Sequence, residues 1–541
     1  MNVIDRVIVQ LAPSWGVSRM RARAVVDVIN RHYEDSGRRR HYEAAQGGRR
    51  TDGWKRANTD ANAANGPAIQ ILRNHARDLV RNNPWAERGK HVIANNTVGW
   101  GIVPEPTAGP RASNKAVDLW RAWAGSTQCD ATGQQDMGGL QRLVISTVAE
   151  SGEAIIQRYR RPLSEGLAIP LQLQVLEGDF IDTGKDAMRT EAGGRIVQGI
   201  EYDALGRRVA YWLYPEHPGA NYQFSRLAPG RSSRRISASD VLHVYRIDRA
   251  GQARGITWYK AVIARLKNFD EFEDAELLRQ KIAACLAGFI TSTDGVSPAM
   301  GAQSAANPVI ETIEPGTLSR LAAGQSVEFT SPPSVTDSGF SDRTLAAVAM
   351  GLGITVEDLT GNYRQMPFSA ARMSRLAHWA NVHAWRWQML VPMFCGPAYR
   401  WAMETAYAAG SLWDVPDATW TAPPMPVLEP DKEALALARM VRTGMITVDE
   451  MIREQGGNPE QHWPAYAKAM DRLDELKIIL DSDPRRTTQA GQPREPTAVK
   501  PKGAARSTER LEISSEELET LVRQMVDRVR AEDAAAGVIG R

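Results

Sequence analysis

The stretch that decides the fold lies near the middle of the chain and reads TWYKAVIARLKNFDEFEDAELLRQKIAACLAGFI, residues 257–290. No proline interrupts it and β-branched residues follow Gly288, so it predicts one helix of roughly 50 Å. Its five basic residues balance its five acidic ones, which are Lys260, Arg265, Lys267, Arg279 and Lys281 against Asp270, Glu271, Glu273, Asp274 and Glu276. A solvated face with pairs such as Lys267–Glu271 is the favoured interpretation. A divalent-metal site in the acidic cluster is the alternative.

Strands are predicted before this helix. They are EAIIQRYRR (153–161), LQLQVLE (171–177), RIVQGIEY (195–202), RRVAYWLY (207–214) and DVLHVYRI (240–247), of which the third and fourth flank a hairpin turn at Asp203–Gly206. Helices are predicted at 68–93, with a break at Pro84, and at 140–150. The region therefore predicts a mixed α+β module with antiparallel strands, which disfavours a doubly wound nucleotide-binding sheet.

The chain changes character after residue 290. Residues 291–341 are rich in Gly, Ser, Pro and Thr around two predicted strands (297–310 and 324–333). A short helix (341–353) and a polar loop (361–367) follow, and then a helix capped by Ser369 that runs to about 409, with kinks expected at Pro392 and Pro397. Its tryptophans are predicted to be core or subunit-interface anchors: Trp379, Trp385, Trp387 and Trp401.

Both ends of the chain carry basic segments. Residues 19–56 are arginine-rich and predict a flexible arm, with contact to DNA or a neighbouring subunit as the alternative. Prolines between 423 and 430 mark a boundary before a compact helical unit (431–480) with turns at Gly444 and Gly456. Residues 484–510 predict a flexible basic linker, and 513–530 predict a helix with a capping box from Ser514 to Glu517.

The composition bounds the function. The chain has 541 residues, which predicts two to four domains, and its net charge of +3 requires any DNA contact to be local. Cys129, Cys285 and Cys395 are far apart and fit a reducing compartment. We expect no signal peptide and no membrane span. Without a P-loop, an H-E-x-x-H or a G-x-S-x-G motif, the sequence predicts no catalytic residues, no metal and no cofactor.

Four segments in collinear order, over about 70 to 480, resemble the lambda-type family of phage portal proteins. DVLHVYRIDRAGQARGITWYKAVIARLKNFDEFEDAELLRQKIAACLAGFI (240–290) resembles its signature stretch, with matches at His243, Gly251, Gln252, Arg254, Gly255 and Lys281–Ala284. The other three are ARDLVRNNPWAERGKHVIANNTVGWGI (76–102), LGITVEDLTGNYRQMPFSAARMSRL (352–376) and EPDKEALALARMVRTGMITVDEMIREQGGNPE (429–460). The chain departs from the family at Asn362, where an Asp is usual, and at Phe368–Ala370, where Tyr-Ser-Ser is usual.

The resemblance implies a portal fold, a mixed α+β subunit of a ring. It implies a flexible basic N-terminal arm (1–65), a β-rich wing (66–256), a stem helix (257–290), a clip (291–341), a second stem helix with a tunnel loop (342–367), a long kinked wing helix (368–425), a helical crown (426–483), and a basic linker with a C-terminal amphipathic helix (484–541). The tunnel loop implies DNA-proximal side chains at Asn362, Tyr363, Arg364, Gln365 and Met366. Candidate channel-lining residues of the stem are Lys267, Asp270, Glu273 and Lys281.

The implied function is that of a ring of about twelve subunits at one capsid vertex. Double-stranded DNA would be packaged and ejected through it, and its implied partners are the terminase large subunit, head–tail adaptor or neck proteins, and the major capsid or scaffold protein. The implied location is the virion, and the host cytoplasm during assembly. Two alternatives stay open, another ring or adaptor component of a virion, and a metal-dependent nucleic-acid enzyme that uses Asp270, Glu273 and Asp274.

Overall fold

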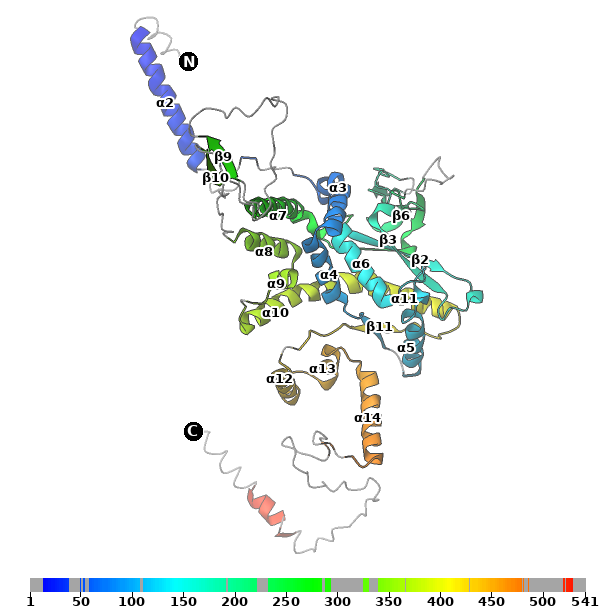
Figure 1. Cartoon of the computed structure of the whole chain (residues 1–541). Coiled ribbons are helices and arrows are strands. Elements are labelled where there is room, and N and C mark those ends of the chain that lie inside the picture. Colours follow the sequence, from blue (N-terminus) through cyan, green and yellow to red (C-terminus); the bar gives the residue numbers. More distant parts are fainter. Residues whose placement is uncertain are drawn as a thin grey trace, which may run out of the picture. The chain divides into compact units, whose positions relative to one another are not determined.

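A computed structural model describes most of the chain (Figure 1). The described residues are 13–37, 49, 52–53, 58–107, 110–190, 193–220, 232–284, 288–292, 325–329, 339–364, 366–427, 429–478, 480, 485, 519–520 and 522–528. They fall into two compact units, one up to Asn458 and one from Pro459 onward. Among the described residues, no helix has both the length and the apolar character needed to cross a membrane.

The first unit mixes helices with small antiparallel sheets, which confirms the α+β class. Its helices are α2 (Pro13–Gly37), α3 (Ala61–Asn82), α4 (Pro84–Val98), α5 (Pro110–Ala124), α6 (Met137–Ser151), α7 (Ile263–Ala284), α8 (Phe340–Leu352), α9 (Val356–Thr360), α10 (Phe368–Trp385), α11 (Gly396–Ala408), α12 (Pro430–Arg442) and α13 (Val448–Glu454). Its strands are β1 (Val103–Thr107), β2 (Glu153–Arg160), β3 (Leu171–Glu177), β4 (Arg195–Val197), β5 (Ile200–Tyr202), β6 (Arg208–Leu213), β7 (Arg234–Ser237), β8 (Val241–Tyr245), β9 (Gly288–Ser292), β10 (Gln325–Phe329) and β11 (Asp417–Thr421).

Two sheets contain the predicted strands. One has the order β3-β2-β8 and the other the order β4-β5-β6-β7, and all neighbours are antiparallel. The hairpin predicted at Asp203–Gly206 joins β5 to β6 and is confirmed. The prediction of one strand over 195–202 was wrong, because the chain turns at Gln198 and Gly199, which both have positive φ, and β4 pairs back on β5.

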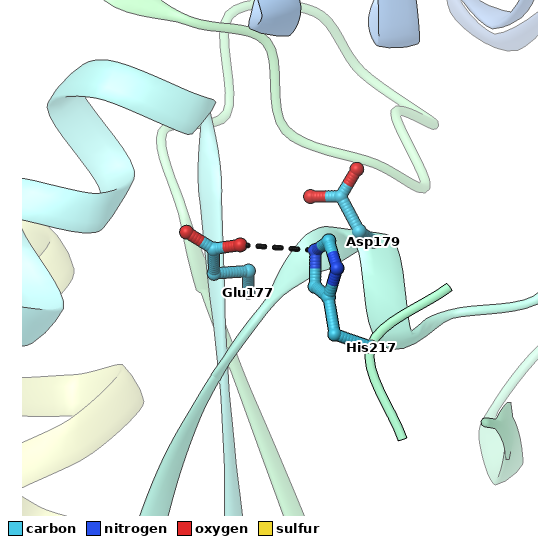
Figure 2. Close-up of side chains that lie close together, drawn as sticks. All are labelled: Glu177, Asp179 and His217. Carbon is cyan, nitrogen blue, oxygen red and sulfur yellow. Dashed lines mark ion pairs between the residues drawn. The ribbon is translucent and has the colours of Figure 1, made fainter. Parts of the chain in front are cut away.

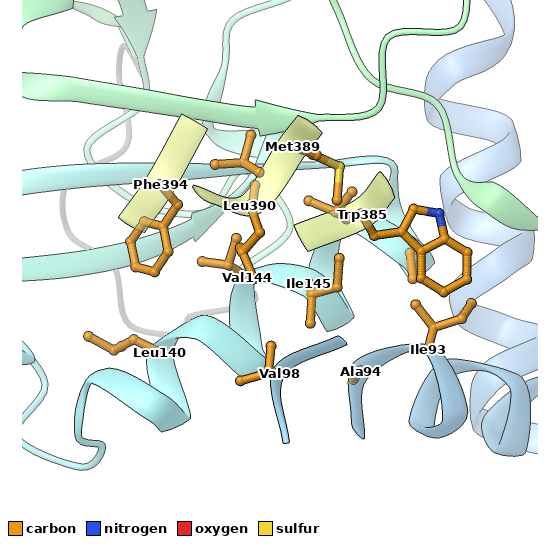
Figure 3. Close-up of a cluster of buried hydrophobic side chains, with 14 of the residues drawn as sticks. Ile93, Ala94, Val98, Leu140, Val144, Ile145, Trp385, Met389, Leu390 and Phe394 are labelled. Atoms are coloured by element: carbon orange, nitrogen blue, oxygen red, sulfur yellow. The ribbon is translucent and has the colours of Figure 1, made fainter. Parts of the chain in front are cut away.

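The main core lies where helices from distant parts of the chain meet the three-stranded sheet. Ile93 of α4, Val144 and Ile145 of α6, and Leu390 in the middle of the helical segment 368–408 are all fully buried there (Figure 3). The predicted break at Pro84 is confirmed, since Asn83 ends α3 and its side chain caps α4. This packing fixes α4 and α6 against the sheet from which α7 departs.

The helix predicted over 257–290 is shorter than expected. Residues Trp258–Ala261 form a separate 3₁₀ turn capped by Thr257, and α7 runs from Ile263 to Ala284. Gly288 belongs to β9, which pairs with β10, so the helix cannot extend to residue 290.

The strand predicted over 324–333 is confirmed as β10, whereas the strand predicted over 297–310 lies outside the described residues.

The prediction that Ser369 caps the long helix was wrong, because α10 begins at Phe368 and its N-cap position is occupied by Pro367, two residues before Ser369. Residues Arg386–Cys395 continue α10 as a π-helix into α11, and Pro392 lies inside this segment. Proline has no N–H for the usual i→i−4 bond, and a π segment is a common way to accommodate such a gap. The expected distortion at Pro392 therefore takes the form of a changed hydrogen-bond pattern.

Arg386 ties this segment to two distant parts of the chain. Its guanidinium donates to the main-chain oxygens of Thr97 (2.6 Å), Asn96 (2.8 Å) and Pro423 (2.8 Å), and it stacks on the ring of Trp379. Burial lowers the pKa of Arg386 to about 10. The side chain is thus a buried cation, and two of its three carbonyl partners, those of Asn96 and Thr97, lie at the C-terminal end of α4, where the helix dipole favours positive charge.

The segment near the N-terminus differs from the predicted flexible arm. Residues 13–37 form the helix α2, although the sequence predicted a flexible arm there. The helical unit predicted over 431–480 contains α12, α13 and, in the second compact unit, α14 (Pro459–Glu475), and Gly444 and Gly456 both adopt the left-handed conformation expected of the turns. The predicted capping box at Ser514 lies outside the described residues.

Candidate functional site

The predicted tunnel loop is an exposed connection between α9 and α10. Gly361 ends α9 with a positive φ of 69°, which glycine adopts without strain. The side chains of Asn362, Tyr363 and Arg364 are exposed, and Tyr363 is 54% exposed despite its aromatic ring. Met366 is half-buried, and Gln365 lies outside the described residues. Three of the five predicted loop residues thus present their side chains to solvent in the single subunit.

Short-range hydrogen bonds give this loop its shape. The amide of Asn362 donates to Oγ1 of Thr360 (3.2 Å), and Oδ1 of Asn362 accepts from the amide of Arg364 (3.3 Å). The amide of Met366 donates to the carbonyl oxygen of Tyr363 (3.3 Å). Because asparagine supports such turns as readily as aspartate does, Asn362 preserves the turn while removing a negative charge.

Polar contacts anchor the base of the loop. Nδ1 of His378 on α10 lies 2.6 Å from a carboxylate oxygen of Asp358 on α9, and the hydroxyl of Ser374 donates to Glu357 (3.0 Å). Arg88 on α4 donates to the carbonyl oxygen of Asp358 (3.0 Å). Burial opposes ionisation of Asp358, but the hydrogen bond from His378 outweighs it and lowers the pKa of the carboxyl. These contacts fix α9 and α10, the two helices that the loop connects, relative to each other.

Charged side chains of both signs lie near the exposed ring of Tyr363. Burial raises the pKa of Tyr363, as does Asp358, while Arg375 and Arg88 lie close enough to oppose that shift. Arg364 is exposed, and within the described part of the chain it has no carboxylate partner within 4.0 Å. The loop and its surroundings thus combine an exposed aromatic ring with several arginines, the residue types that contact nucleic-acid backbones and bases.

The predicted stem residues differ in environment. Lys267 and Lys281 on α7 are exposed. Asp270 accepts a hydrogen bond from Nδ2 of Asn83, between α3 and α4, and burial raises the pKa of its carboxyl. Burial likewise raises the pKa of Glu273, which a hydrogen bond from Trp85 opposes. Both carboxyl groups therefore contact the α3–α4 corner of the same subunit.

Within the described structure, the acidic residues of α7 do not gather their carboxylates around one point. Asp270, Glu273 and Asp274 do not bring their ligand atoms together, whereas those of Glu177, Asp179 and His217 lie within 4.8 Å of one another (Figure 2). That second group already has cationic partners, because Arg77 lies 2.6 Å from Asp179 and 3.0 Å from Glu177, and Arg73 lies 3.2 Å from Asp179. These arginines compensate the carboxylates in place of a metal ion.

Sequence reasoning missed the buried residue that organises the signature stretch. Glu153, at the start of β2, is completely buried and accepts hydrogen bonds from Arg254, from Arg73 (2.6 Å) and from the amide of Gly255 (2.9 Å). Nε2 of His243 lies 3.0 Å from the same carboxylate. Burial alone would raise the pKa of Glu153, but Arg254, His243 and Arg73 outweigh it and hold the pKa well below its usual range. The sequence signal was a carboxylate within an apolar strand, which requires a buried partner.

The motif residues of 251–255 form the other side of this network. Gln252 accepts from the amides of Asp248 (3.0 Å) and Arg249 (3.2 Å) and donates to the carbonyl oxygen of Arg254 (2.8 Å). Arg254 also donates to the carbonyl oxygens of Gly178 (2.9 Å) and Gln198 (3.1 Å). The residues of the signature thus stabilise a turn and fix the position of the chain before α7 begins. They belong to a structural framework.

This organisation is that of a structural protein with an exposed, partly basic loop at the end of a helical framework. Residues 47–386 match the model of the phage portal proteins of the lambda family, and the chain belongs to that family. Family members are structural and not catalytic, so the interpretation of the chain as a nucleic-acid enzyme is set aside.

Relatives with known names agree with this assignment. The probable portal protein of Halomonas phage phiHAP-1 is 25% identical over 442 residues, which is 76% of this chain and 82% of the relative. The portal protein of Escherichia phage N15 is 24% identical over 61% of this chain and 68% of the relative, and portal protein B of Escherichia phage lambda is 24% identical over 60% and 67%. A solved chain from the neck of a native gene transfer agent particle is 16% identical over 72% of this chain and 94% of that chain, with a TM-score of 0.41.

Proposed function

We propose that the chain forms a closed ring of about twelve subunits at one capsid vertex, and that double-stranded DNA enters and leaves through its centre. The observation that supports this is the family match over 47–386, which includes the three-stranded sheet, α7 and the exposed loop. A ring of identical subunits needs one heterologous interface that repeats by rotation until it closes.

The proposal assigns a role to each predicted region. Residues 66–256 and 368–425 form the wing, 257–290 and 342–360 the stem, and 291–341 the clip, which docks the terminase large subunit and later the adaptor or neck proteins. Residues 426–483 form the crown inside the capsid, where the major capsid or scaffold protein is a further partner. The ring assembles in the host cytoplasm and remains in the virion.

The charges of α7 suit a channel through which DNA slides. Each phosphate that a protein neutralises adds to a salt-sensitive affinity, so about twelve strongly basic helices would hold DNA in place. On α7 the basic residues are outnumbered by the acidic ones, and Glu276 pairs with Arg279 on the same helix. The exposed Lys267 and Lys281 then give weak attraction, and Arg364 is the loop residue that we place nearest to DNA.

The experiment that tests the ring is mass photometry of the purified protein, combined with negative-stain microscopy. A dozen chains of 59.6 kDa give particles of about 715 kDa, which should show a central hole. A monodisperse monomer or dimer over a range of salt concentrations would contradict the proposal, because a heterologous interface leaves both of its faces open in the monomer.

The loop assignment has its own test. The variant Arg364→Gln should form normal rings but should change the rate of DNA packaging by purified rings, prohead and terminase, with a weaker dependence on salt. Arg207→Gln is the matched control, since Arg207 is an exposed arginine in the turn between β5 and β6. If the two variants package DNA at the same rate as the unaltered ring, Arg364 does not face the DNA.

A further inference from the structure

The helix α2 (Pro13–Gly37) has 25 residues, and its described side chains are open to solvent in the single subunit. Every described side chain between Ser14 and Asn30 is exposed. Seven large apolar side chains are among them, from Met20 at 40% to Trp15 at 71%. A helix in water gains most of its stability by packing an apolar face, and exposed apolar surface on this scale marks a contact with another molecule. The helix therefore requires a partner that the described part of one subunit does not supply.

The apolar side chains of α2 form two stripes. The first stripe consists of Trp15, Ala22, Val26 and Ile29, at intervals of seven, four and three residues. The second stripe consists of Val17, Met20, Ala24 and Val28, at intervals of three, four and four residues. Such intervals keep the members of a stripe on one side of a helix. Each residue turns the helix by about 100°, so positions two apart, such as Ala22 and Ala24, point in nearly opposite directions. The two stripes therefore lie on opposite sides of α2.

Polar residues separate the two stripes. By the same rotation, Arg19, Arg23 and Asn30 lie on one flank, and Arg21 lies on the other. Contact with DNA through these arginines would cover a flank and leave both stripes in water. A membrane surface covers a single apolar face, and a symmetric pair of helices buries the same stripe of both. Each of these partners leaves at least one stripe exposed, so α2 requires an apolar neighbour on each of two sides.

We propose that α2 packs between the α2 helices of the two adjacent subunits, with the first stripe of one helix against the second stripe of the next. Such a contact joins two different faces of identical helices, so it repeats by rotation, and in a closed ring no stripe is left uncovered. The inference rests on the proposed ring. It adds a contact outside the family match, because α2 ends before residue 47, where that match begins.

The length of the chain and the dimensions of helices allow this packing. Residues 38–60 connect α2 to α3, and a chain of this length can span at most roughly 75 Å, which lets α2 reach an adjacent subunit. Packed helix axes lie about 9 Å apart, so about twelve of them close a belt about 35 Å across. Ala22 and Ala24 are the smallest members of their stripes and lie within one turn of each other, so neighbouring helices can approach closely there.

The test is disulfide trapping in the assembled, full-length protein. The double variant Ala22→Cys/Ala24→Cys places one thiol on each stripe, and the two thiols of one helix face apart and cannot bond to each other. We expect oxidation to link each subunit to both of its neighbours, which gives a ladder from dimers to about twelve chains on non-reducing gels. Each single variant and the unaltered protein should stay monomeric on these gels, since Cys129 and Cys395 are buried.

Mass photometry of the same samples separates this inference from the ring itself. Rings with a ladder in the double variant alone support the packing. Rings without a ladder, both in this variant and in Val26→Cys/Val28→Cys one turn further along, overturn the packing and leave the ring in place. Dimers from a single variant also overturn it, because they show that a stripe pairs with itself. A ladder without rings supports the helix contact and contradicts the ring, and the absence of both contradicts both.

A charged residue placed in a stripe tests the apolar character of the contact. Added to the double cysteine variant, Val26→Glu should reduce the cross-linked fraction at least about fivefold, because it buries a carboxylate between two helices. Asn30→Glu is the matched control, since it places the same side chain on a flank and should leave the ladder unchanged. Val26 and Asn30 are both exposed in the single subunit, so neither change disturbs its core. Equal cross-linking in the two variants would overturn the assignment of the stripes.

Discussion

Replacement of the buried carboxylate of Glu153 by an amide should destabilise the protein strongly. Arg73 and Arg254 are 2% and 1% exposed, and both rely on this carboxylate for charge compensation. Glu153→Gln keeps the size of the side chain but leaves Arg254 without a carboxylate partner, while Arg73 retains Asp179 at 3.2 Å. Removing one partner of a buried ion pair costs about 3–5 kcal/mol. This corresponds to a fall of roughly 10 °C in the thermal midpoint.

The assay is a thermal melt followed by circular dichroism, on the Glu153→Gln variant and on a control. The control is Glu165→Gln, which removes a carboxylate that lies 4.0 Å from Arg161 at the surface, where both partners are more than a third exposed. Exposed pairs contribute about 0–1 kcal/mol, so its midpoint should stay within about 2 °C of that of the unaltered protein. Our account of the network is refuted if Glu153→Gln melts at the same temperature as this control.

Three further predictions concern buried residues of the same compact unit. Burial lowers the pKa of His243 to about 4, whereas an unfolded imidazole titrates near pH 6.5. The thermal midpoint should therefore be constant above about pH 6.5 and should fall as the pH is lowered from 6.5 to 4. A thermal midpoint that does not change over this range would contradict the prediction. Arg386→Met should cost about 3 kcal/mol or more, measured by chemical denaturation, because it leaves three main-chain carbonyls without their donor. Gly255→Ala should lower the yield of soluble protein, because its methyl carbon would lie 2.1 Å from the carbonyl oxygen of Gly152; normal yield and melting would show that the backbone can move there.

Local patterns predicted the strands because their cause is local. The first half of β3 alternates between buried and half-buried residues, and β2 carries β-branched residues and is buried on both faces over its first four residues. The turn at Asp203–Gly206 is formed by residues within four positions of one another. The turn between β4 and β5 escaped detection because Gln198 adopts a positive φ, which a glutamine rarely does. Its amide donates to Asp186 (2.6 Å), twelve residues away, so a tertiary contact holds the conformation.

The start of α7 was mispredicted for a related reason. Residues 257–262 carry the apolar pattern of a helix, but Trp258 and Tyr259 are both buried in the main core. Packing of these two rings places them in a 3₁₀ turn, and periodicity does not distinguish such a turn from the first turn of an α-helix. The loop at 361–367 was predicted from its composition, whereas its anchor, the contact between Asp358 and His378, joins two helices and has no local signature.

The structural role of residues 251–259 in the signature stretch is to fix the orientation of α7. Glu153 bonds the amide of Gly255, Thr257 donates to the carbonyl oxygen of Ala149 (3.3 Å), and the hydroxyl of Tyr259 donates to that of Ala86 (2.6 Å). Three bonds over five residues thus fix the chain to β2, α6 and α4 immediately before the helix begins. A small rotation at that point would displace the far end of a 22-residue helix, about 33 Å long, by several ångströms. In the ring that we propose, every subunit would have to aim this helix in the same way, so the buried charges would serve the geometry of the assembly as well as the stability of one chain.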